Sequence, residues 1–253
     1  MRRIIDLSAP IEESPPGTPE FQRNAIQYFD HAAGAAEVER LYGVPPRLLR
    51  DGEGWTREIV SLGTHNSTHV DAPYHYNSRI QGRPAATIDE LPLEMFLGPG
   101  VVVDFSDRED GDAVGAAAIE EALAASGGRR SPGDIVLVRT GRDAFYGQAD
   151  YIDRGPGVTA EATRWLYDQG VRVMGIDAWG WDRPLRMQAR DALERDAAGV
   201  FWEAHQVDLL YAQIERLVGL DQLPPDGFTV ACFPVRIVGA SAAPARVVAI
   251  IDE

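Results

Sequence analysis

Short runs of β-branched and other apolar residues recur along the chain and alternate with segments of helical pattern. Such runs, roughly four to eight residues long and bounded by turn-forming residues, are typical of buried strands. The expected strands are RRIIDLS, REIVSLGTH, GVVVDFS, DIVLVRTG, VRVMGIDAW, FTVACFPVRIVG and ARVVAIID. Strands that alternate with single helices predict an α/β fold, here a mixed α/β domain with a central β core.

Helices are expected over four segments of the sequence, which are 32–44, 115–126, 159–170 and 205–217. In the third, Thr159 is a candidate N-cap and Gly170 a candidate stop signal. No internal repeat, low-complexity tract or linker divides the sequence. Residues 1–253 are therefore predicted to form a single domain.

The charge balance excludes several classes of partner. The chain has 24 Lys and Arg against 39 Asp and Glu, a net charge of −15, whereas nucleic acids and anionic membranes attract basic surfaces. There is no signal-peptide pattern and no apolar run near the ~18 residues that span a bilayer. The single cysteine, Cys232, excludes an internal disulfide and is interpreted as a small buried hydrophobe. We expect a cytoplasmic protein that acts on a small molecule, without nucleic-acid or membrane partners.

The stretch HNSTHVDAPYH, from His65 to His75, holds three of the five histidines of the chain and one carboxylate, Asp71. A helix is not expected over this stretch. Residues 66–67, Asn-Ser, favour a turn, and Pro73 keeps the residue before it extended.

In an extended chain, His69 and Asp71 lie on the same face because they are two residues apart. His65 would lie about 13 Å from His69 in a straight strand, at about 3.3 Å per residue. Ligands of one metal ion each lie about 2 Å from it, so all three can share an ion only if the chain bends at Asn66-Ser67.

Two imidazoles and a carboxylate suit a catalytic Zn²⁺ or Mn²⁺ site and leave a coordination position for water. The alternative is that these histidines are ordinary surface or core residues, which is the usual state of a lone histidine. Their clustering around one aspartate favours the metal site. His75 lies beyond the rigid Ala72-Pro73 step and could return beside the ion without ligating it.

The same stretch resembles the signature H-x-G-T-H-x-D-x-P-x-H of the cyclase family of metal-dependent hydrolases. That family includes bacterial kynurenine formamidases, isatin hydrolases and ring-opening lactone hydrolases. The segments IIDLSAPI, IVLVRTG, VMGIDAW and FPVRIVGASAAPARVVAIID are similar to other strands of the family. The resemblance implies the family's swivelling β/β/α type of fold, and homodimers or homotetramers.

By motif position, the resemblance implies that His65, His69 and Asp71 are metal ligands and that His75 is the catalytic acid/base. The chain departs from the signature at Ser67, where the family usually has glycine.

The segment AHQVDLLYAQIERLVGLDQLP resembles the part of the family that supplies a further histidine and a glutamate, here His205 and Glu215. One or two divalent ions, Zn or Mn, are implied. In a continuous helix, ten residues would separate these two by about 15 Å. They can share a site only if the helix breaks between them.

Two tryptophans, Trp179 and Trp181, lie at the end of the predicted strand VRVMGIDAW. They could line a pocket for a planar substrate, or they could be packing residues. Arg142 stands where the family commonly has an aromatic residue.

The resemblance implies a hydrolase that opens a cyclic amide, imide or lactone, or cleaves an N-formyl amide. A divalent ion lowers the pKa of its water toward roughly 7, and a histidine acid/base then serves the leaving group. Two alternatives remain open at this point. One is a polyketide-type cyclase or dehydratase that uses the same metal site, and the other is a non-catalytic metal-binding protein.

Overall fold

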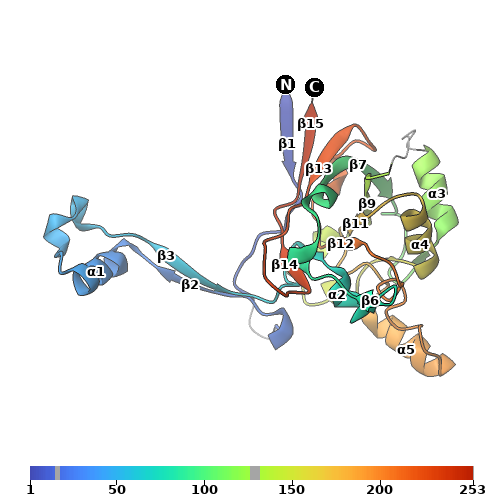
Figure 1. The fold of residues 1–253 in the computed structure, drawn as a ribbon, viewed down its shortest axis with the longest axis horizontal. Coiled ribbons are helices and arrows are strands. Elements are labelled where there is room, and N and C mark those ends of the chain that lie inside the picture. Colours follow the sequence, from blue (N-terminus) through green and yellow to red (C-terminus); the bar gives the residue numbers. More distant parts are fainter. Residues whose placement is uncertain (15–17, 126–131, 253) are drawn as a thin grey trace. The chain divides into compact units, whose positions relative to one another are not determined.

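The computed structural model describes residues 1–14, 18–125 and 132–252 (Figure 1). The chain divides into two compact units, one of Met1–Pro10 with Ser67–Glu253 and one of Ile11–Asn66. Each unit is described by itself below. The expectation of a single domain over 1–253 stays a prediction.

The larger unit is built on a nine-stranded sheet with the order β1-β15-β13-β7-β9-β11-β12-β4-β14. Strands β7, β9, β11 and β12 run parallel, and the other pairings are antiparallel. The strands are β1 (Arg2–Asp6), β4 (His69–Asp71), β7 (Leu97–Asp104), β9 (Ile135–Arg139), β11 (Val173–Ile176), β12 (Ala212–Glu215), β13 (Phe228–Ala231), β14 (Ala242–Pro244) and β15 (Val248–Asp252).

The middle of this sheet is buried on both faces, as the continuous apolar runs predict. In β9, Ile135 and Leu137 belong to one apolar cluster, and Val136 and Val138 belong to the other. Helices α3 (Ala116–Ala125) and α4 (Ala160–Asp168) cover the second of these faces (Figure 1). The predicted mixed α/β fold with a central β core is confirmed.

Helix α4 shows why its boundaries were predictable. The Thr159 hydroxyl accepts a hydrogen bond from the Ala162 amide at 3.1 Å, as an N-cap does. Gly170 follows the helix with φ +93°, which a residue with a side chain rarely adopts. The larger unit also contains α2 (Pro73–Tyr76) and α5 (Leu185–Arg195), neither of which the sequence predicted.

Short elements complete the larger unit. The pairs β5 (Arg79–Ile80) with β6 (Arg83–Pro84) and β8 (Ala113–Val114) with β10 (Gly157–Val158) are two-stranded. The 3₁₀ turns are η4 (Ile88–Glu90), η5 (Leu93–Phe96), η6 (Arg142–Phe145), η7 (Tyr151–Asp153) and η8 (Leu220–Gln222).

Two expectations about the C-terminal third were wrong. The helix expected over 205–217 is instead a series of turns followed by β12, a strand buried between two neighbours. The strand expected over 228–239 ends at Ala231. Cys232, which follows it, is fully buried, and burial raises the pKa of its thiol to about 12. Its interpretation as a buried hydrophobe is confirmed.

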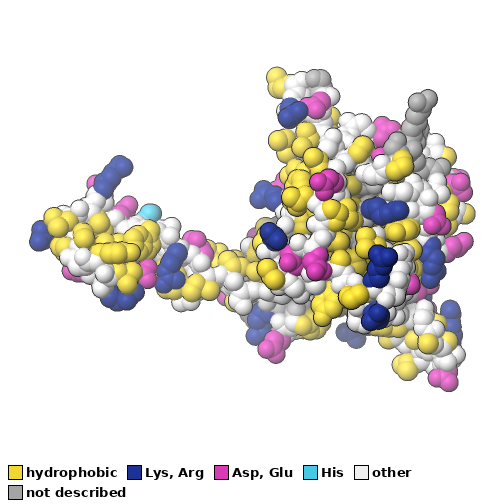
Figure 2. All heavy atoms as spheres, viewed as in Figure 1, with side chains coloured by type: hydrophobic (Ala, Val, Ile, Leu, Met, Phe, Trp, Pro, Cys, Tyr) yellow, Lys and Arg dark blue, Asp and Glu magenta, His cyan; other side chains and the backbone are white. Residues whose placement is uncertain are grey.

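The smaller unit pairs β2 (Ala25–Phe29) with β3 (Arg57–Ser61) in an antiparallel ribbon next to α1 (His31–Tyr42). The helix begins at the N-cap Asp30 and ends before Gly43, so the expected helix over 32–44 is confirmed. The unit also contains η1 (Glu20–Gln22), η2 (Pro46–Leu48) and η3 (Arg50–Gly52). Figure 2 shows hydrophobic side chains exposed over the end of this unit that carries α1.

Among the helices of the described chain, none combines the length and the apolar character that crossing a bilayer requires.

Candidate active site

The antiparallel pairing of β4 with β12 gathers four polar side chains on one face of the sheet. The register places Glu215 opposite His69, and Gln213 opposite Asp71. Residues two apart in a strand share a face, so these side chains form a two-by-two array. None of the four is more than 5% exposed. Such a set of polar groups in the interior of a sheet indicates a functional site, because buried polar groups are costly unless satisfied.

The distances in this array suit a shared cation. The His69 Nε2 atom lies 3.3 Å from Asp71 Oδ1 and 3.6 Å from Glu215 Oε2. Two ligands about 2.1 Å from one ion at a tetrahedral angle are about 3.4 Å apart. His69 Nδ1 lies 2.9 Å from the Ser67 carbonyl oxygen, which can only accept. A neutral imidazole in this tautomer therefore presents the Nε2 lone pair to two carboxylates.

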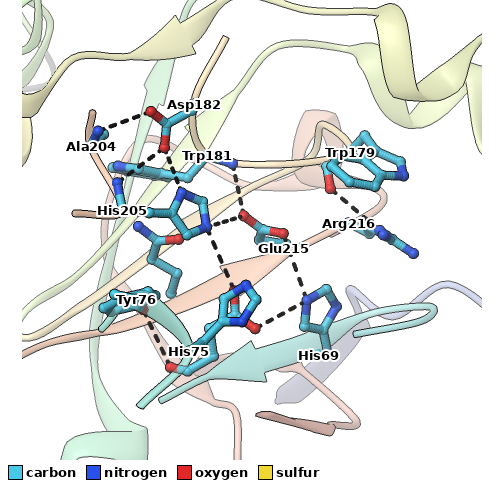
Figure 3. A network of polar contacts seen from close by, with 12 residues as sticks. His69, His75, Tyr76, Trp179, Trp181, Asp182, Ala204, His205, Glu215 and Arg216 are labelled. Carbon is cyan, nitrogen blue, oxygen red and sulfur yellow. Dashed lines mark hydrogen bonds and ion pairs between the residues drawn. The ribbon is translucent and has the colours of Figure 1, made fainter. Parts of the chain in front are cut away.

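His205 reaches the same array from the turns that precede β12 (Figure 3). Its Nε2 lies 3.4 Å from Glu215 Oε1 and 3.9 Å from Asp71 Oδ2. On its other side, Nδ1 is 2.5 Å from Asp182 Oδ2. Asp182 is itself held by the amides of Ala204 and His205, at 2.9 Å and 3.1 Å. A carboxylate that fixes the far nitrogen of a ligand histidine is a regular feature of metal sites.

The charges in this group determine how its members titrate. Burial lowers the pKa of His205, but its hydrogen bonds to Asp182 and Glu215 outweigh this and raise the pKa to about 10. Burial and the neighbouring Asp71 raise the pKa of Glu215, but the contacts with His205 and His69 lower it further, so the net shift is downward. The contacts of His205 with Asp182 and Glu215 thus favour a positive charge beside these carboxylates, which either a proton or a metal ion can supply.

The single turn of α2 returns His75 to the site. Its Nε2 lies 4.0 Å from Asp71 Oδ2, and the side chain remains 23% exposed. Trp202 packs edge-on against His75 with ring centroids 4.9 Å apart, and it stacks on His205 at 4.6 Å. Trp202 has φ +62°, and its amide donates to Gln188 Oε1 of α5 at 2.5 Å. His75 is therefore beside the array but closer to solvent than its other members.

The bend expected at Asn66-Ser67 is confirmed. Ser67 has φ +58°, a left-handed conformation that glycine adopts most easily, and this explains the glycine of the family signature. Its hydroxyl donates to the Ala9 carbonyl at 2.8 Å. His65 precedes the bend and belongs to the smaller unit. Its role as a ligand stays a prediction.

A divalent ion fits the residues of the larger unit. Ligand atoms of His69, Asp71 and Glu215 all lie within 4.8 Å of one another, and the three residues are buried. The Gln213 Oε1 atom is buried and has no hydrogen-bond partner in the described chain, while its Nε2 donates to the Tyr211 hydroxyl at 2.6 Å. Nitrogen and carboxylate oxygen ligands suit Zn²⁺ and Mn²⁺.

A family model described as "Putative cyclase" matches residues 5–183, which is more than half of the chain. The chain belongs to this cyclase family. Two relatives of the cyclase-family chain are a kynurenine formamidase of Salinibacter ruber and an isatin hydrolase of Roseibium aggregatum. The first is 31% identical over 75% of this chain and 77% of its own length, and the second is 26% identical over 99% and 90%.

A solved isatin hydrolase A from Ralstonia solanacearum has a similar fold, with a TM-score of 0.76 and 25% identity. It covers 99% of this cyclase-family chain and 92% of its own. These relatives are hydrolases, and this chain is a hydrolytic enzyme of the same family. The predictions of family, fold and enzyme class are thus confirmed.

Several site residues were not predicted from the sequence of this cyclase-family protein. Asp182, Trp202 and Gln213 were not assigned roles, because each matters through a partner that only the fold brings near. A carboxylate just past a strand end was the available signal for Asp182. Trp181 is a packing residue, since it is fully buried and its indole N–H donates to Thr163 at 3.0 Å. Arg142 pairs with Asp110 at 2.9 Å, outside the array.

Proposed function

We propose that the protein is a divalent-metal-dependent hydrolase that opens a cyclic amide, imide or lactone, or cleaves an N-formyl amide. The observation that carries the proposal is the buried array of His69, Asp71 and Glu215, to which His205 is directed by Asp182. The names of the two relatives, kynurenine formamidase and isatin hydrolase, support this range of substrates. By its position in the signature, His65 completes the proposed ligands.

The bound ion would supply Lewis acidity and water of lowered pKa. The residues of the chain divide the remaining work. His75 is close to Asp71 and partly exposed, so it can take a proton from water and deliver it to the leaving nitrogen or oxygen. Asp182 holds the His205 ring in one orientation. Trp202 covers both imidazoles and limits the access of bulk water.

The proposed metal is Zn or Mn, with one or two ions in each chain. Asp71 and Glu215 each lie within 4 Å of both His69 and His205, and this arrangement supports either number. Elemental analysis of the purified protein tests this directly. A protein with no stoichiometric divalent metal, which soaking in Zn²⁺ or Mn²⁺ does not restore, would contradict the proposal.

A sharper test separates the histidine proposed as acid/base from those proposed as metal ligands. We expect His75→Ala to keep its metal and lose about 10²–10⁴-fold in kcat, the usual worth of general acid–base catalysis. His69→Ala and His65→Ala should lose metal and activity together. His31→Ala is the matched control, because His31 contacts the Gly54 carbonyl within the smaller unit, and it should change neither. Loss of metal from His75→Ala would make His75 a ligand instead.

The protein is also proposed to form homodimers or homotetramers. A two-stranded ribbon is only marginally stable in water, yet both faces of the β2–β3 ribbon expose apolar side chains, among them Tyr28, Ile59 and Val60. A second copy would cover them. Light scattering coupled to gel filtration should give a multiple of the 27.6 kDa chain mass. Val60→Lys should shift the protein toward the monomer, and a monomeric wild type would refute the assembly.

A further inference from the structure

Arg216, which directly follows Glu215, is a buried cation that the proposed chemistry does not use. The residue is 8% exposed. Its Nε donates to the Trp179 carbonyl at 3.3 Å, and its guanidinium carbon lies 4.8 Å from the centre of the Trp179 ring. Among the described residues, none places a carboxylate oxygen within 4 Å of the guanidinium. A buried charge without a paired counter-charge is costly, so its retention calls for a ligand.

The backbone at Arg216 adopts a strained, left-handed conformation. Its φ is +59°, which is uncommon for a residue other than Gly, Asn or Asp. Two contacts hold it there, because its amide donates to the Ala178 carbonyl at 3.1 Å and its carbonyl accepts from the Thr68 hydroxyl at 2.5 Å. Strain of this kind tends to occur at functional sites. In Figure 3, Arg216 and Trp179 lie on the opposite side of Glu215 from His205.

The neighbours of Arg216 do not neutralise it. Tyr146 and Tyr151 are near enough to interact electrostatically, but their hydroxyls donate to the Pro10 and Asp177 carbonyls, at 3.2 Å and 3.4 Å. The carboxylates whose charges act on Arg216 are those of Glu215, which has the larger effect, and Asp71. A divalent ion at the array would balance those two carboxylates, and the positive charge of Arg216 would then remain for an anionic ligand.

We propose that Arg216 and Trp179 form a subsite that binds a carboxylate group next to the metal array. This inference rests on the proposed hydrolase function. A guanidinium binds a carboxylate through paired, charge-assisted hydrogen bonds. The Trp179 ring beneath the guanidinium carbon and the bond from Nε to the Trp179 carbonyl hold the group in place. The carboxylate has two possible sources. It is either a fixed substituent of the substrate or the group that hydrolysis creates, when water adds hydroxyl to the carbonyl carbon and a proton to the departing nitrogen.

The test is calorimetric titration of the Mn²⁺-loaded enzyme with benzoate and with its uncharged counterpart, benzamide. We expect the wild type to prefer benzoate. Arg216→Met should weaken benzoate binding about tenfold to a hundredfold, as expected for a charge-assisted hydrogen bond, and leave benzamide unchanged. Arg216→Lys, which keeps the charge but not the fork, should fall between them and also serves if the methionine variant does not fold.

The matched control is Arg172→Met. The Arg172 guanidinium also lies over an aromatic ring, 3.7 Å from the centre of Tyr167, and donates to backbone carbonyls at 2.8 Å and 2.9 Å. It should bind benzoate like the wild type. If benzoate binds to wild type and Arg216→Lys equally tightly, or does not bind to the wild type, the subsite is refuted.

Two further probes distinguish the sources of the carboxylate. Phthalamate carries the carboxylate that opening a cyclic imide creates, and 4-carboxyphthalimide carries one on the intact ring system. If Arg216→Lys binds only phthalamate more weakly than the wild type does, the subsite belongs to the product. If it binds only 4-carboxyphthalimide more weakly, the subsite belongs to the substrate. The metal proposal is tested separately, by metal content. If the enzyme contains its metal but replacing Arg216 does not change benzoate binding, only the carboxylate subsite is refuted.

Discussion

Replacing Asp182 separates the positioning of a metal ligand from the ligand itself. The carboxylate of Asp182 accepts three hydrogen bonds, from His205 Nδ1 and from the amides of Ala204 and His205. In Asp182→Asn, the amide oxygen can keep both bonds to His205 only if the NH₂ group faces the Ala204 amide. The hydrogen bond from the Ala204 amide is then lost, and this amide faces the NH₂ group of the asparagine, so that two donors meet.

Two magnitudes follow from this geometry. Leaving a buried donor unsatisfied costs about 1–3 kcal/mol, so Asp182→Asn should lower the free energy of unfolding by that amount. Losing the orienting charge should weaken metal affinity about 10–100-fold, which is about 1.4–2.8 kcal/mol. Asp182→Ala removes both acceptor oxygens, and with them all three hydrogen bonds, and should be affected more strongly in both measurements. In this variant the His205 imidazole would also lose the contact that fixes its tautomer. If the proton moves to Nε2, that nitrogen can no longer bind the metal.

The assay is competition for Zn²⁺ with a chelating indicator, alongside urea denaturation of the metal-free protein. Asp177→Asn is the control. Asp177 is also buried and also accepts three hydrogen bonds, but from Thr140 and Gly141 and none from a site histidine. It should lose comparable stability and retain its metal affinity. If Asp182→Ala folds and binds Zn²⁺ as tightly as the wild type, the orienting role of Asp182 is wrong.

Three further outcomes are expected. Ser67→Ala should lower the free energy of unfolding by about 1 kcal/mol in urea, whereas Ser67→Gly should stay closer to the wild type because it adopts φ +58° without strain. In the metal-free protein, the raised pKa of His205, about 10 against 6.5, stabilises the fold fully below pH 6.5, and this contribution is lost as pH rises toward 10. Denaturation at pH 6.5 and 9.5 should show the loss in the wild type but not in His205→Gln. Trp202→Ala should lower the free energy of unfolding by about 2 kcal/mol, and Trp202→Phe should restore most of it, by the same assay.

Local signals were sufficient where the determinants of structure are local. The cap at Thr159, the stop at Gly170 and the apolar runs of the parallel strands all act within a few residues. In the motif from 65 to 75, the period of an extended chain gave the shared face of His69 and Asp71. The bend at Asn66-Ser67 followed from the turn preference of these residues and from the hypothesis of a shared ion.

The segment 205–217 shows where such signals fail. Its composition suits a helix, but β12 is held between β11 and β4, and this pairing overrides local preference. The apparent 15 Å separation of His205 and Glu215 disappears once the chain turns between them. Asp182 could not be assigned from sequence for a related reason, because its partner His205 is 23 residues away and meets it only in the fold.

The register that joins His69 to Glu215 has a consequence for how the sheet opens. The site stands on β4 and β12, strands of three and four residues, with β14 of three residues at the edge beyond. Ladders this short are expected to fray before the long central strands do. A cation bound by residues of both β4 and β12 would hold these two strands together. Amide hydrogens of β4 and β14 should therefore exchange with deuterium much faster after chelation, while those of β7 and β9 keep their rates.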